Sequence, residues 1–305
     1  MRESFFNALY GVMRKRADVF ILISDTGAIV LDRIRRDFKG RCVNVGIAES
    51  NMVSVAAGMA MAGKTVYIYA IVPFVTRRCY EQLLIDVCCQ GLDVKVIGIG
   101  AGLDYSTLGP THHGQDDLAL MRNMPGMSVL TASDKTSAAA FARASLERKG
   151  PVYIRLERYG GSIYGRGAKF DGAPRLLRDG ADICLLACGK MVSTALEAAA
   201  ELEKHSISAR VVDCYCLKPL AAAELERAVG SAGHIATLEE HSVIGGLGSA
   251  VAEFLAERGK GVRFMRFGMA DAFCRVYGKR EFLHRQMGID RESVVSRVIA
   301  WMKEE

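Results

Sequence analysis

The sequence predicts an α/β protein of two domains, each a mostly parallel sheet with helices on both faces. Short apolar runs rich in valine and isoleucine alternate with longer amphipathic runs along the whole chain, as strands and helices do in α/β folds. The short runs are apolar at nearly every position, which indicates strands covered on both faces, because strands with one exposed face alternate. The length of 305 residues, half of them apolar, is typical of two domains with sizeable cores.

The order of these runs gives the expected elements. The strands are expected at residues 19–24, 66–71, 94–99, 128–131, 152–156, 183–187, 209–213, 234–238 and 262–267. The helices are expected at 3–14, 49–62, 79–89, 115–122, 135–147, 192–205, 221–229 and 247–258. Ser133 and Asp134 precede the helical run 135–147, and serine and aspartate favour helix starts.

Residues 157–180 break this rhythm with six glycines and one proline. Such a composition is typical of a linker. It predicts a first domain over residues 1–165 and a second over 178–305, each long enough for an α/β core.

Composition excludes several classes of function. Lys and Arg exceed Asp and Glu by 40 to 34, a net charge of +6 without a dense basic run, which gives little support to nucleic-acid binding. The most apolar stretch, residues 52–62, is about half the roughly 20 residues that a membrane-spanning helix needs. The nine cysteines include no C-x-x-C pair and mostly lie in apolar runs, as reduced core cysteines do. We therefore expect a cytoplasmic protein without a structural metal site.

A lone glutamate, Glu49, opens the apolar, small-residue run 49–62. One interpretation is that its carboxylate complements the dipole at a helix start. The other is that the apolar surroundings bury Glu49, since a buried carboxyl group can serve as a hydrogen-bond donor in catalysis.

Two further segments follow strands. Phe74 comes after the strand 66–71, at the carboxyl end where α/β proteins bind ligands; alternatively it fills a gap in the core. The glycine-rich loop after the strand 94–99 carries His112 and His113. No further Cys or His lies near them in sequence, so contact with a hydroxylated substrate or proton transfer is favoured over metal binding.

Arginines and glycines near the later strands allow other contacts. Arg155 and Arg158 close the strand 152–156; one of them suits a phosphate, which the guanidinium fork can bind with two hydrogen bonds. The glycines at 245–248 precede a helix, but Val251 stands where a dinucleotide motif has its third glycine. Close packing of a strand and a helix is the better account of these glycines.

Taken together, these segments resemble the transketolase family of thiamine diphosphate (TPP) enzymes over residues 1–305. The resemblance is carried by GIAESNM at 46–52, by the stretch from GPTHH to TASD at 109–134, and by EEHSVIGGLGSAVAE at 239–253. It implies the family's pyrimidine-binding domain followed by its C-terminal domain. The family's G-D-G…N motif for diphosphate and Mg²⁺ is absent. The chain thus resembles the C-terminal subunit of a split transketolase, whose N-terminal partner subunit would hold diphosphate and Mg²⁺ in an α2β2 heterotetramer.

The resemblance gives roles to the candidate residues. Glu49 matches the glutamate that hydrogen-bonds the pyrimidine nitrogen of TPP and thereby helps to activate the cofactor. Phe74 falls where the family stacks an aromatic ring on the pyrimidine, and Tyr80 lies in the same cofactor-binding segment.

The substrate contacts follow by the same comparison. His112 matches a substrate-contacting histidine with a catalytic role, and His113 lies beside it. Arg158 matches a phosphate-contacting arginine, and Arg2 is a second candidate for the phosphate.

Departures from the family pattern point to an unusual substrate. Leu108 stands where typical members carry an aspartate that contacts a substrate hydroxyl, and another substrate-facing histidine aligns near Gly100. We expect transfer of a two-carbon ketol unit from a phosphorylated or modified ketose to an aldose. The alternatives are a deoxyxylulose-phosphate synthase-like enzyme, a 2-oxoacid dehydrogenase β subunit and a non-catalytic assembly subunit. The presence of Glu49 argues against the last of these.

Overall fold

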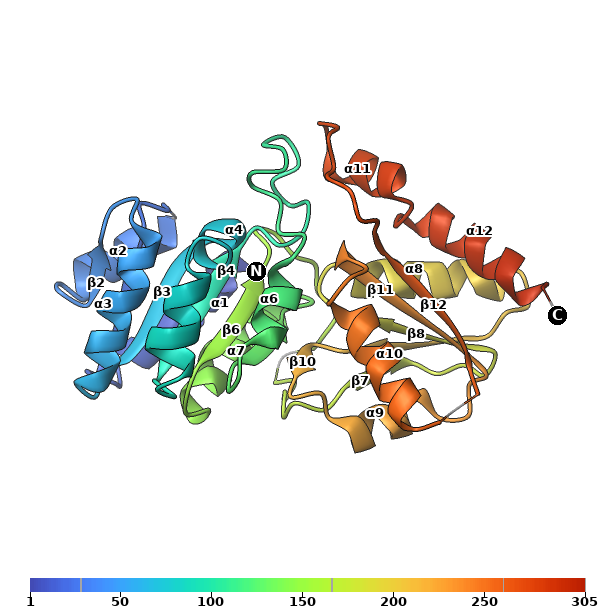
Figure 1. Cartoon of the computed structure of the whole chain (residues 1–305), viewed down its shortest axis with the longest axis horizontal. Coiled ribbons are helices and arrows are strands. Elements are labelled where there is room, and N and C mark those ends of the chain that lie inside the picture. The colour runs from blue at the N-terminus through green and yellow to red at the C-terminus, as the bar shows by residue number, and fades with distance from the viewer. Residues whose placement is uncertain (28, 166, 260, 305) are drawn as a thin grey trace. The chain divides into compact units, whose positions relative to one another are not determined.

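The computed structural model describes residues 1–27, 29–165, 167–259 and 261–304. Contacts divide the chain into two compact units (Figure 1). The first comprises Met1–Ala101 and Leu120–Phe170, and the second comprises Gly102–Ala119 and Asp171–Glu305. The segment 102–119 therefore belongs to the second unit by its contacts, although its neighbours in sequence on both sides belong to the first.

Parallel strands form the centre of the first unit. Their order across the sheet is β5 (Ser128–Thr131), β6 (Val152–Leu156), β4 (Val94–Ile99), β3 (Thr65–Ile71), β1 (Val19–Ile23) and β2 (Cys42–Asn44). Every residue of β4 and β6 is buried, including Lys95 and Arg155. Burial on both faces explains why these strands are apolar at nearly every position rather than alternating.

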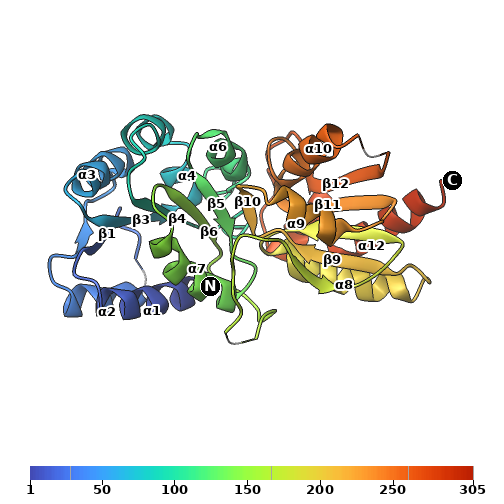
Figure 2. The same cartoon turned by 90° about the horizontal axis from the view of Figure 1, so that it is seen from below.

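Helices cover both faces of this sheet. They are α1 (Arg2–Met13), α2 (Ile29–Asp37), α3 (Glu49–Met61), α4 (Val72–Val75), α5 (Tyr80–Gln82), the π-helical turn η1 (Leu83–Cys88), α6 (Asp117–Asn123) and α7 (Lys135–Glu147). Helices α1, α2 and α7 lie on one face and α3 and α4 on the other (Figure 2). Phe6 of α1 meets Tyr69 of β3 edge to face, with ring centroids 4.9 Å apart, so aromatic packing fixes α1 on the sheet.

The predicted helix start at Asp134 is confirmed. Its carboxylate accepts a hydrogen bond from the Ser137 amide at 2.7 Å, and the Ser137 hydroxyl lies 3.0 Å from the Asp134 amide, completing a reciprocal cap. The second carboxylate oxygen accepts the amides of Ile163 and Tyr164, each at 2.9 Å. One buried aspartate thus starts α7 and holds the chain that follows β6.

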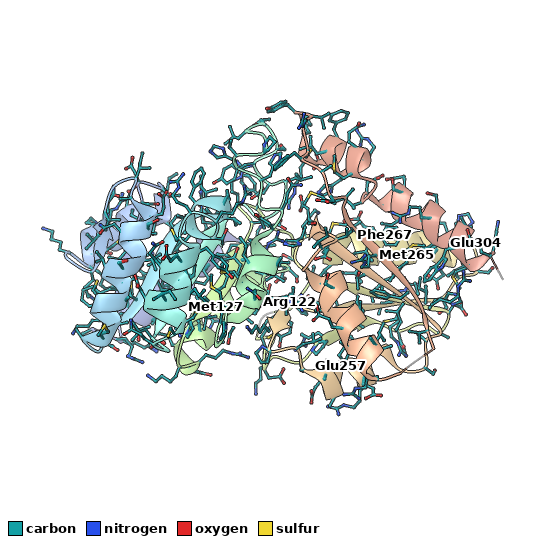
Figure 3. All side chains as sticks on the ribbon, in the orientation of Figure 1. Arg122, Met127, Glu257, Met265, Phe267 and Glu304 are labelled. Atoms are coloured by element: carbon teal, nitrogen blue, oxygen red, sulfur yellow. The ribbon has the colours of Figure 1, made fainter. Side chains whose placement is uncertain are left out.

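The second unit has a five-stranded sheet in the order β12 (Arg263–Met269), β11 (His234–Ser242), β8 (Ile183–Ala187), β9 (Ala209–Asp213) and β7 (Arg175–Arg178). All pairs are parallel except β7 with β9. The remaining elements are β10 (Cys216–Lys218), α8 (Met191–Glu203), α9 (Ala222–Val229), α10 (Leu247–Glu257), α11 (Arg280–Met287) and α12 (Arg291–Met302). Phe267 of β12, labelled in Figure 3, is fully buried beneath the guanidinium of Arg297 from α12.

The predicted α/β class with mostly parallel sheets is confirmed, with local corrections. The predicted linker 157–180 contains β7, a short antiparallel strand at one end of the order. The predicted helix 79–89 is a short α-helix followed by η1. The predicted helix 115–122 begins only at Asp117, because the backbone oxygen of Gln115 accepts a hydrogen bond from the Ser242 amide instead.

Charged helices and an exposed strand escaped prediction. These elements are α2, α11, α12 and β2. α2 buries only Leu31 and Ile34 among arginines and aspartates, so its apolar face is narrow. β2 is a three-residue strand at the end of its sheet and is largely exposed.

The nine cysteines are all free thiols in the part of the chain that the structure describes. Burial raises the pKa of the Cys79 thiol to about 11 and that of Cys184 to about 12, as expected for apolar surroundings. None of the described helices combines the length and apolar composition that crossing a bilayer requires.

Candidate active site

Glu49 is a buried carboxylate at the start of α3, with 2% of its surface exposed. The hydroxyl of Ser24, which directly follows β1, donates to Oε1 at 3.2 Å. Nη1 of Arg78 donates to Oε2 at 2.5 Å. The apolar, small-residue run after Glu49 packs α3 against β3, and Glu49 and Met52 of the first turn are buried. The burial expected from the sequence is present, and the carboxylate is held from both sides.

Phe74 lies in the short helix α4, directly after β3. The guanidinium carbon of Arg78 lies over the Phe74 ring, 4.5 Å from its centroid. Arg78 therefore contacts both an aromatic face and the Glu49 carboxylate, while 43% of its side chain is exposed. This arrangement joins a flat cation, a ring face and a buried acid in one place on the first unit.

Tyr80 begins α5, two residues after Arg78. Its hydroxyl accepts a hydrogen bond from Nδ2 of Asn123 at 2.9 Å. This hydrogen bond holds the Tyr80 side chain against Asn123. Cofactor binding by Tyr80 stays a prediction.

Arg2 and Arg158 come from neighbouring segments. Arg158 follows β6, and its backbone oxygen lies 3.5 Å from the amino group of Met1, the residue before Arg2. A Cβ atom on Gly160 would lie 2.6 Å from the Met1 side chain, which shows how closely the two segments approach. The start of α1 thus meets the end of β6, and both predicted phosphate-contacting arginines are at this junction.

The two histidines lie on the segment that belongs to the second unit. Nδ1 of His112 lies 2.9 Å from the Thr111 hydroxyl, and its half-buried ring meets that of Tyr105. Partial burial lowers the pKa of His112, which favours the neutral imidazole near pH 7. His113 is fully buried. The neighbouring histidines therefore differ in accessibility, since only the His112 side chain of the two is partly exposed.

The loop that carries the histidines is closed by backbone hydrogen bonds. The amide of Gly102 donates to the oxygen of Gly114 at 3.1 Å, and the amide of Gly114 returns a bond at 2.8 Å. Leu108, the departure from the family pattern, lies on this loop with 47% of its surface exposed.

The glycines at 245–248 hold a carboxylate of the protein itself. The Glu239 side chain accepts the amides of Leu247 at 2.7 Å and Gly248 at 2.8 Å. A Cβ atom on Gly246 would collide with Oε2 of Glu239. The first turn of α10 therefore receives its negative charge from Glu239, in agreement with close strand–helix packing as the reason for the glycines.

A charged cluster that was not predicted from the sequence surrounds Glu240. This residue of β11 is buried and contacts Arg280 and His284 of α11 and the Leu103 amide. The available signal was the pair of acids Glu239 and Glu240 directly after the apolar strand run, because acids that a strand buries are normally paired.

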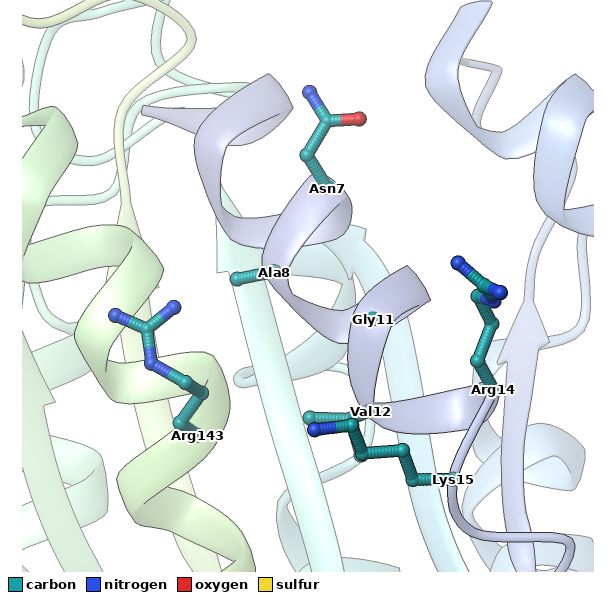
Figure 4. A pocket seen from close by; sticks show the side chains of 7 residues that line it. All are labelled: Asn7, Ala8, Gly11, Val12, Arg14, Lys15 and Arg143. Atoms are coloured by element: carbon teal, nitrogen blue, oxygen red, sulfur yellow. The ribbon is translucent and has the colours of Figure 1, made fainter.

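A groove of about 550 Å³ on the first unit lies along α1 and α7. Figure 4 shows Arg14, Lys15 and Arg143 around it, together with Asn7 and the small residues of α1. Among the described residues that line this groove, none belongs to the predicted cofactor or substrate set.

Comparisons with known proteins agree with the arrangement in both units. Residues 1–160 match the family model for the transketolase pyrimidine-binding domain, and residues 172–294 match that for the transketolase C-terminal domain. The chain is 36% identical to the 6-deoxy-6-sulfo-D-fructose transketolase subunit SqwH of Clostridium sp. (strain MSTE9), over 97% of this chain and 92% of that protein. It is 30% identical to one subunit of the apulose-4-phosphate transketolase of Phocaeicola vulgatus, over 99% of this chain and 97% of that protein.

A solved structure described as a split gene transketolase, inactive β4 tetramer, superimposes with a TM-score of 0.88. It is 34% identical and covers 99% of this chain and 97% of its own. The chain therefore belongs to the transketolase family. In length and domain content it matches the subunits of split transketolases.

Proposed function

We propose that this chain is the C-terminal subunit of a TPP-dependent transketolase, a cytoplasmic transferase of carbohydrate metabolism. It would transfer a two-carbon ketol unit from a ketose to an aldose. The observation that carries the proposal is the buried Glu49 carboxylate, which the guanidinium of Arg78 joins to the Phe74 ring. The family places these two groups against the pyrimidine of TPP, and both are retained here in one site on the first unit.

The contacts of Arg78 support the fit of an aminopyrimidine at this place. Its guanidinium is flat, carries N–H donors, lies over the Phe74 ring and donates to Glu49. An aminopyrimidine is also flat and would make the same two contacts, a stack on Phe74 and a hydrogen bond to Glu49. Since Arg78 is partly exposed, its side chain has room to turn to solvent when the pyrimidine binds.

In this proposal, TPP would supply a carbon nucleophile for ketol transfer when it is bound. Glu49 holds and exchanges a proton at the pyrimidine nitrogen, while Ser24 fixes the orientation of its carboxylate through Oε1. Phe74 positions the pyrimidine ring by stacking. Burial of Glu49 excludes water and strengthens these interactions.

Substrate contacts are assigned to His112, Arg158 and Arg2. A neutral imidazole on His112 can hydrogen-bond a sugar hydroxyl and exchange a proton with it. Arg158 and Arg2 supply cationic forks that suit a terminal phosphate or another anionic group on the sugar. Leu108 removes the family's usual carboxylate for a substrate hydroxyl, so the donor is a phosphorylated or modified ketose. The similarity to subunits named for sulfofructose and apulose phosphate supports this substrate class.

The proposal requires a partner subunit. The chain lacks the G-D-G…N motif, so an N-terminal transketolase subunit would bind Mg²⁺ and the diphosphate of TPP. We propose an α2β2 heterotetramer as the working assembly. The match to split-transketolase subunits over nearly their whole length supports the division of labour.

The test is reconstitution. The purified chain is mixed with an N-terminal subunit, TPP and Mg²⁺, and turnover is measured with ketose phosphates, a sulfonated ketose and pyruvate as donors. Two-carbon transfer from a ketose only in the mixture is expected. CO₂ release from pyruvate would instead indicate a deoxyxylulose-phosphate synthase-like or 2-oxoacid dehydrogenase-like enzyme. A stable assembly with no turnover on any donor would indicate a non-catalytic subunit.

A further inference from the structure

Glu240, at the carboxyl-terminal part of β11, gathers donors from two distant segments of the second unit. Its Oε1 accepts the Leu103 amide, Nε of Arg280 and Nε2 of His284, each at 2.9 Å. Nη2 of Arg280 donates to Oε2. Burial alone would raise the pKa of Glu240, but Arg280 and His284 hold it well below its usual range. The carboxylate is therefore ionised and joins α11 to the first residues of the histidine loop, residues 102–114.

Arg280 extends this connection to a second acid on the loop. Its Nη1 lies 3.6 Å from Oδ1 of Asp104, which is buried. One guanidinium thus links the β11 carboxylate to the loop carboxylate. Arginine is suited to this position because its planar fork can engage two acids at once.

The backbone of the loop is shaped for this contact. Gly102 has φ of +55°, and a Cβ atom there would lie 2.6 Å from the carboxylate carbon of Glu240 and 2.7 Å from its backbone oxygen. Any side chain at 102 would therefore push Glu240 away from the Leu103 amide. Glycine at this position lets the loop start directly on the buried carboxylate.

The tip and the far end of the loop are held by the same unit. The Ser242 amide donates to the backbone oxygen of Gln115 at 2.8 Å. At the tip, a Cβ atom on Gly109 would lie 2.8 Å from the Tyr277 ring. The loop therefore meets elements of the second unit at its start, its tip and its end.

We propose that Glu240, Arg280 and His284 are positioning residues for substrate recognition: they form a clamp through which the C-terminal domain sets the conformation of the histidine loop. The clamp contacts neither TPP nor the sugar and acts through His112 and its neighbours. This inference rests on the proposed function, in which His112 contacts the substrate. It gives the C-terminal domain an indirect part in donor binding.

The test compares Arg280→Lys with Arg285→Lys, an exposed arginine on the same helix. Lysine keeps a positive charge beside Glu240, so the buried carboxylate still has an ionic partner. Lysine cannot, however, engage both Glu240 and Asp104 at once. Asp104→Asn is a second variant that removes only the loop acid. Amide hydrogen exchange over residues 102–114 is measured on the chain, and donor KM and kcat are measured on the reconstituted enzyme.

Arg280→Lys and Asp104→Asn are expected to speed exchange in the loop by about tenfold or more, with the amides of β8 unchanged. Donor KM should rise by roughly three- to tenfold with kcat within about twofold, the pattern of a lost contact shared by ground and transition states. Arg285→Lys should change neither quantity.

Unchanged loop exchange in both variants would overturn the clamp. Faster exchange with an unchanged donor KM would show that the cluster only stabilises the fold and would overturn its role in recognition. Absence of ketol transfer by the wild-type assembly would mean failure of the proposed function instead, and hydrogen exchange on the chain would still decide whether the clamp exists.

Discussion

Nη1 of Arg78 lies 2.5 Å from Oε2 of Glu49, and the same guanidinium covers the Phe74 ring. The pair joins a partly exposed cation to a carboxylate that is almost completely buried. Arg78 compensates the charge of Glu49 and at the same time occupies the place that the proposal gives to the pyrimidine. Cofactor binding and the Arg78–Glu49 ion pair are then mutually exclusive.

Replacing Glu49 tests the centre of the mechanism. Glu49→Gln keeps the shape of the side chain but cannot exchange a proton with the pyrimidine nitrogen. We expect kcat to fall by about 10²–10⁴-fold, with a modest loss of TPP affinity because stacking remains. The measurement is proton exchange at C2 of TPP, followed by NMR in the reconstituted complex. Glu81→Gln, at an exposed glutamate of the same unit, is the control. Exchange at the wild-type rate in Glu49→Gln would mean that Glu49 only complements the dipole at the helix start. Such a carboxylate contributes ~1 kcal/mol or less to the free energy of unfolding.

Removing Arg78 should help the cofactor to bind. In Arg78→Met, TPP no longer has to displace a guanidinium from Glu49 and Phe74. A partly exposed ion pair contributes up to ~1 kcal/mol, so we expect the Kd for TPP to fall by up to about fivefold. Calorimetry on the reconstituted complex measures this, with the exposed neighbour Arg77→Met as control. Weaker TPP binding in Arg78→Met alone would mean that Arg78 contacts the cofactor rather than competing with it.

The exposed Leu108 should control the choice of donor. Leu108→Asp restores a carboxylate where typical family members bind a substrate hydroxyl. Because a site that hydrogen-bonds a hydroxyl discriminates strongly against substrates lacking it, kcat/KM for ordinary ketose phosphates should improve relative to the native donor. Thr107→Asp, which adds the same charge at the adjacent exposed position, is the control. An unchanged ratio of kcat/KM between the two donors would remove Leu108 from the determinants of specificity.

Glu240 should make the protein sensitive to acid. Its folded-state pKa is lowered, so the unfolded chain binds the proton more readily. The associated stability is present above the unfolded value of about 4.3 and is lost as the pH falls below it. Urea unfolding is measured at pH 7 and at points between about pH 5 and pH 3. The free energy of unfolding should fall more steeply with decreasing pH for wild type than for Glu240→Gln. The control Glu257→Gln, at an exposed glutamate (Figure 3), should show the same pH dependence as wild type. Equal slopes of unfolding free energy against pH for wild type and Glu240→Gln would contradict the role of Glu240 in acid sensitivity.

Periodicity predicted the strands that are buried on both faces and missed several helices and short strands. The strands β3, β4 and β6 are apolar at nearly every position because both faces are covered, and their ranges were predicted closely. α2 has only Leu31 and Ile34 as buried anchors, too few for an apolar pattern to stand out. β7 lies within a glycine-rich stretch and pairs antiparallel with β9, so tertiary pairing outweighs its local composition.

The site shows a similar division. Glu49 was identified because an acid is conspicuous in an apolar run, and its burial follows from that run. The contact between Arg78 and Phe74 depends on the turn after α4, which no periodicity encodes. Arg280 and Glu240 are 40 residues apart, and a pairing over that separation leaves no local signal. The roles of all the predicted site residues stay predictions, as do the boundaries 1–165 and 178–305; the residues are Glu49, Phe74, Tyr80, His112, His113, Arg158 and Arg2.

The assignment of residues 102–119 to the second unit has a consequence for recombination. Cutting the gene in the glycine-rich stretch near residue 170 would separate β11 and α11 from the loop that Glu240 and Arg280 hold. A chimera that exchanges only the C-terminal domain between two relatives would then pair one protein's loop with another protein's anchors. The unit that can be exchanged is therefore discontinuous in sequence. A chimera has to take the 18 residues Gly102–Ala119 from the same protein as its C-terminal domain.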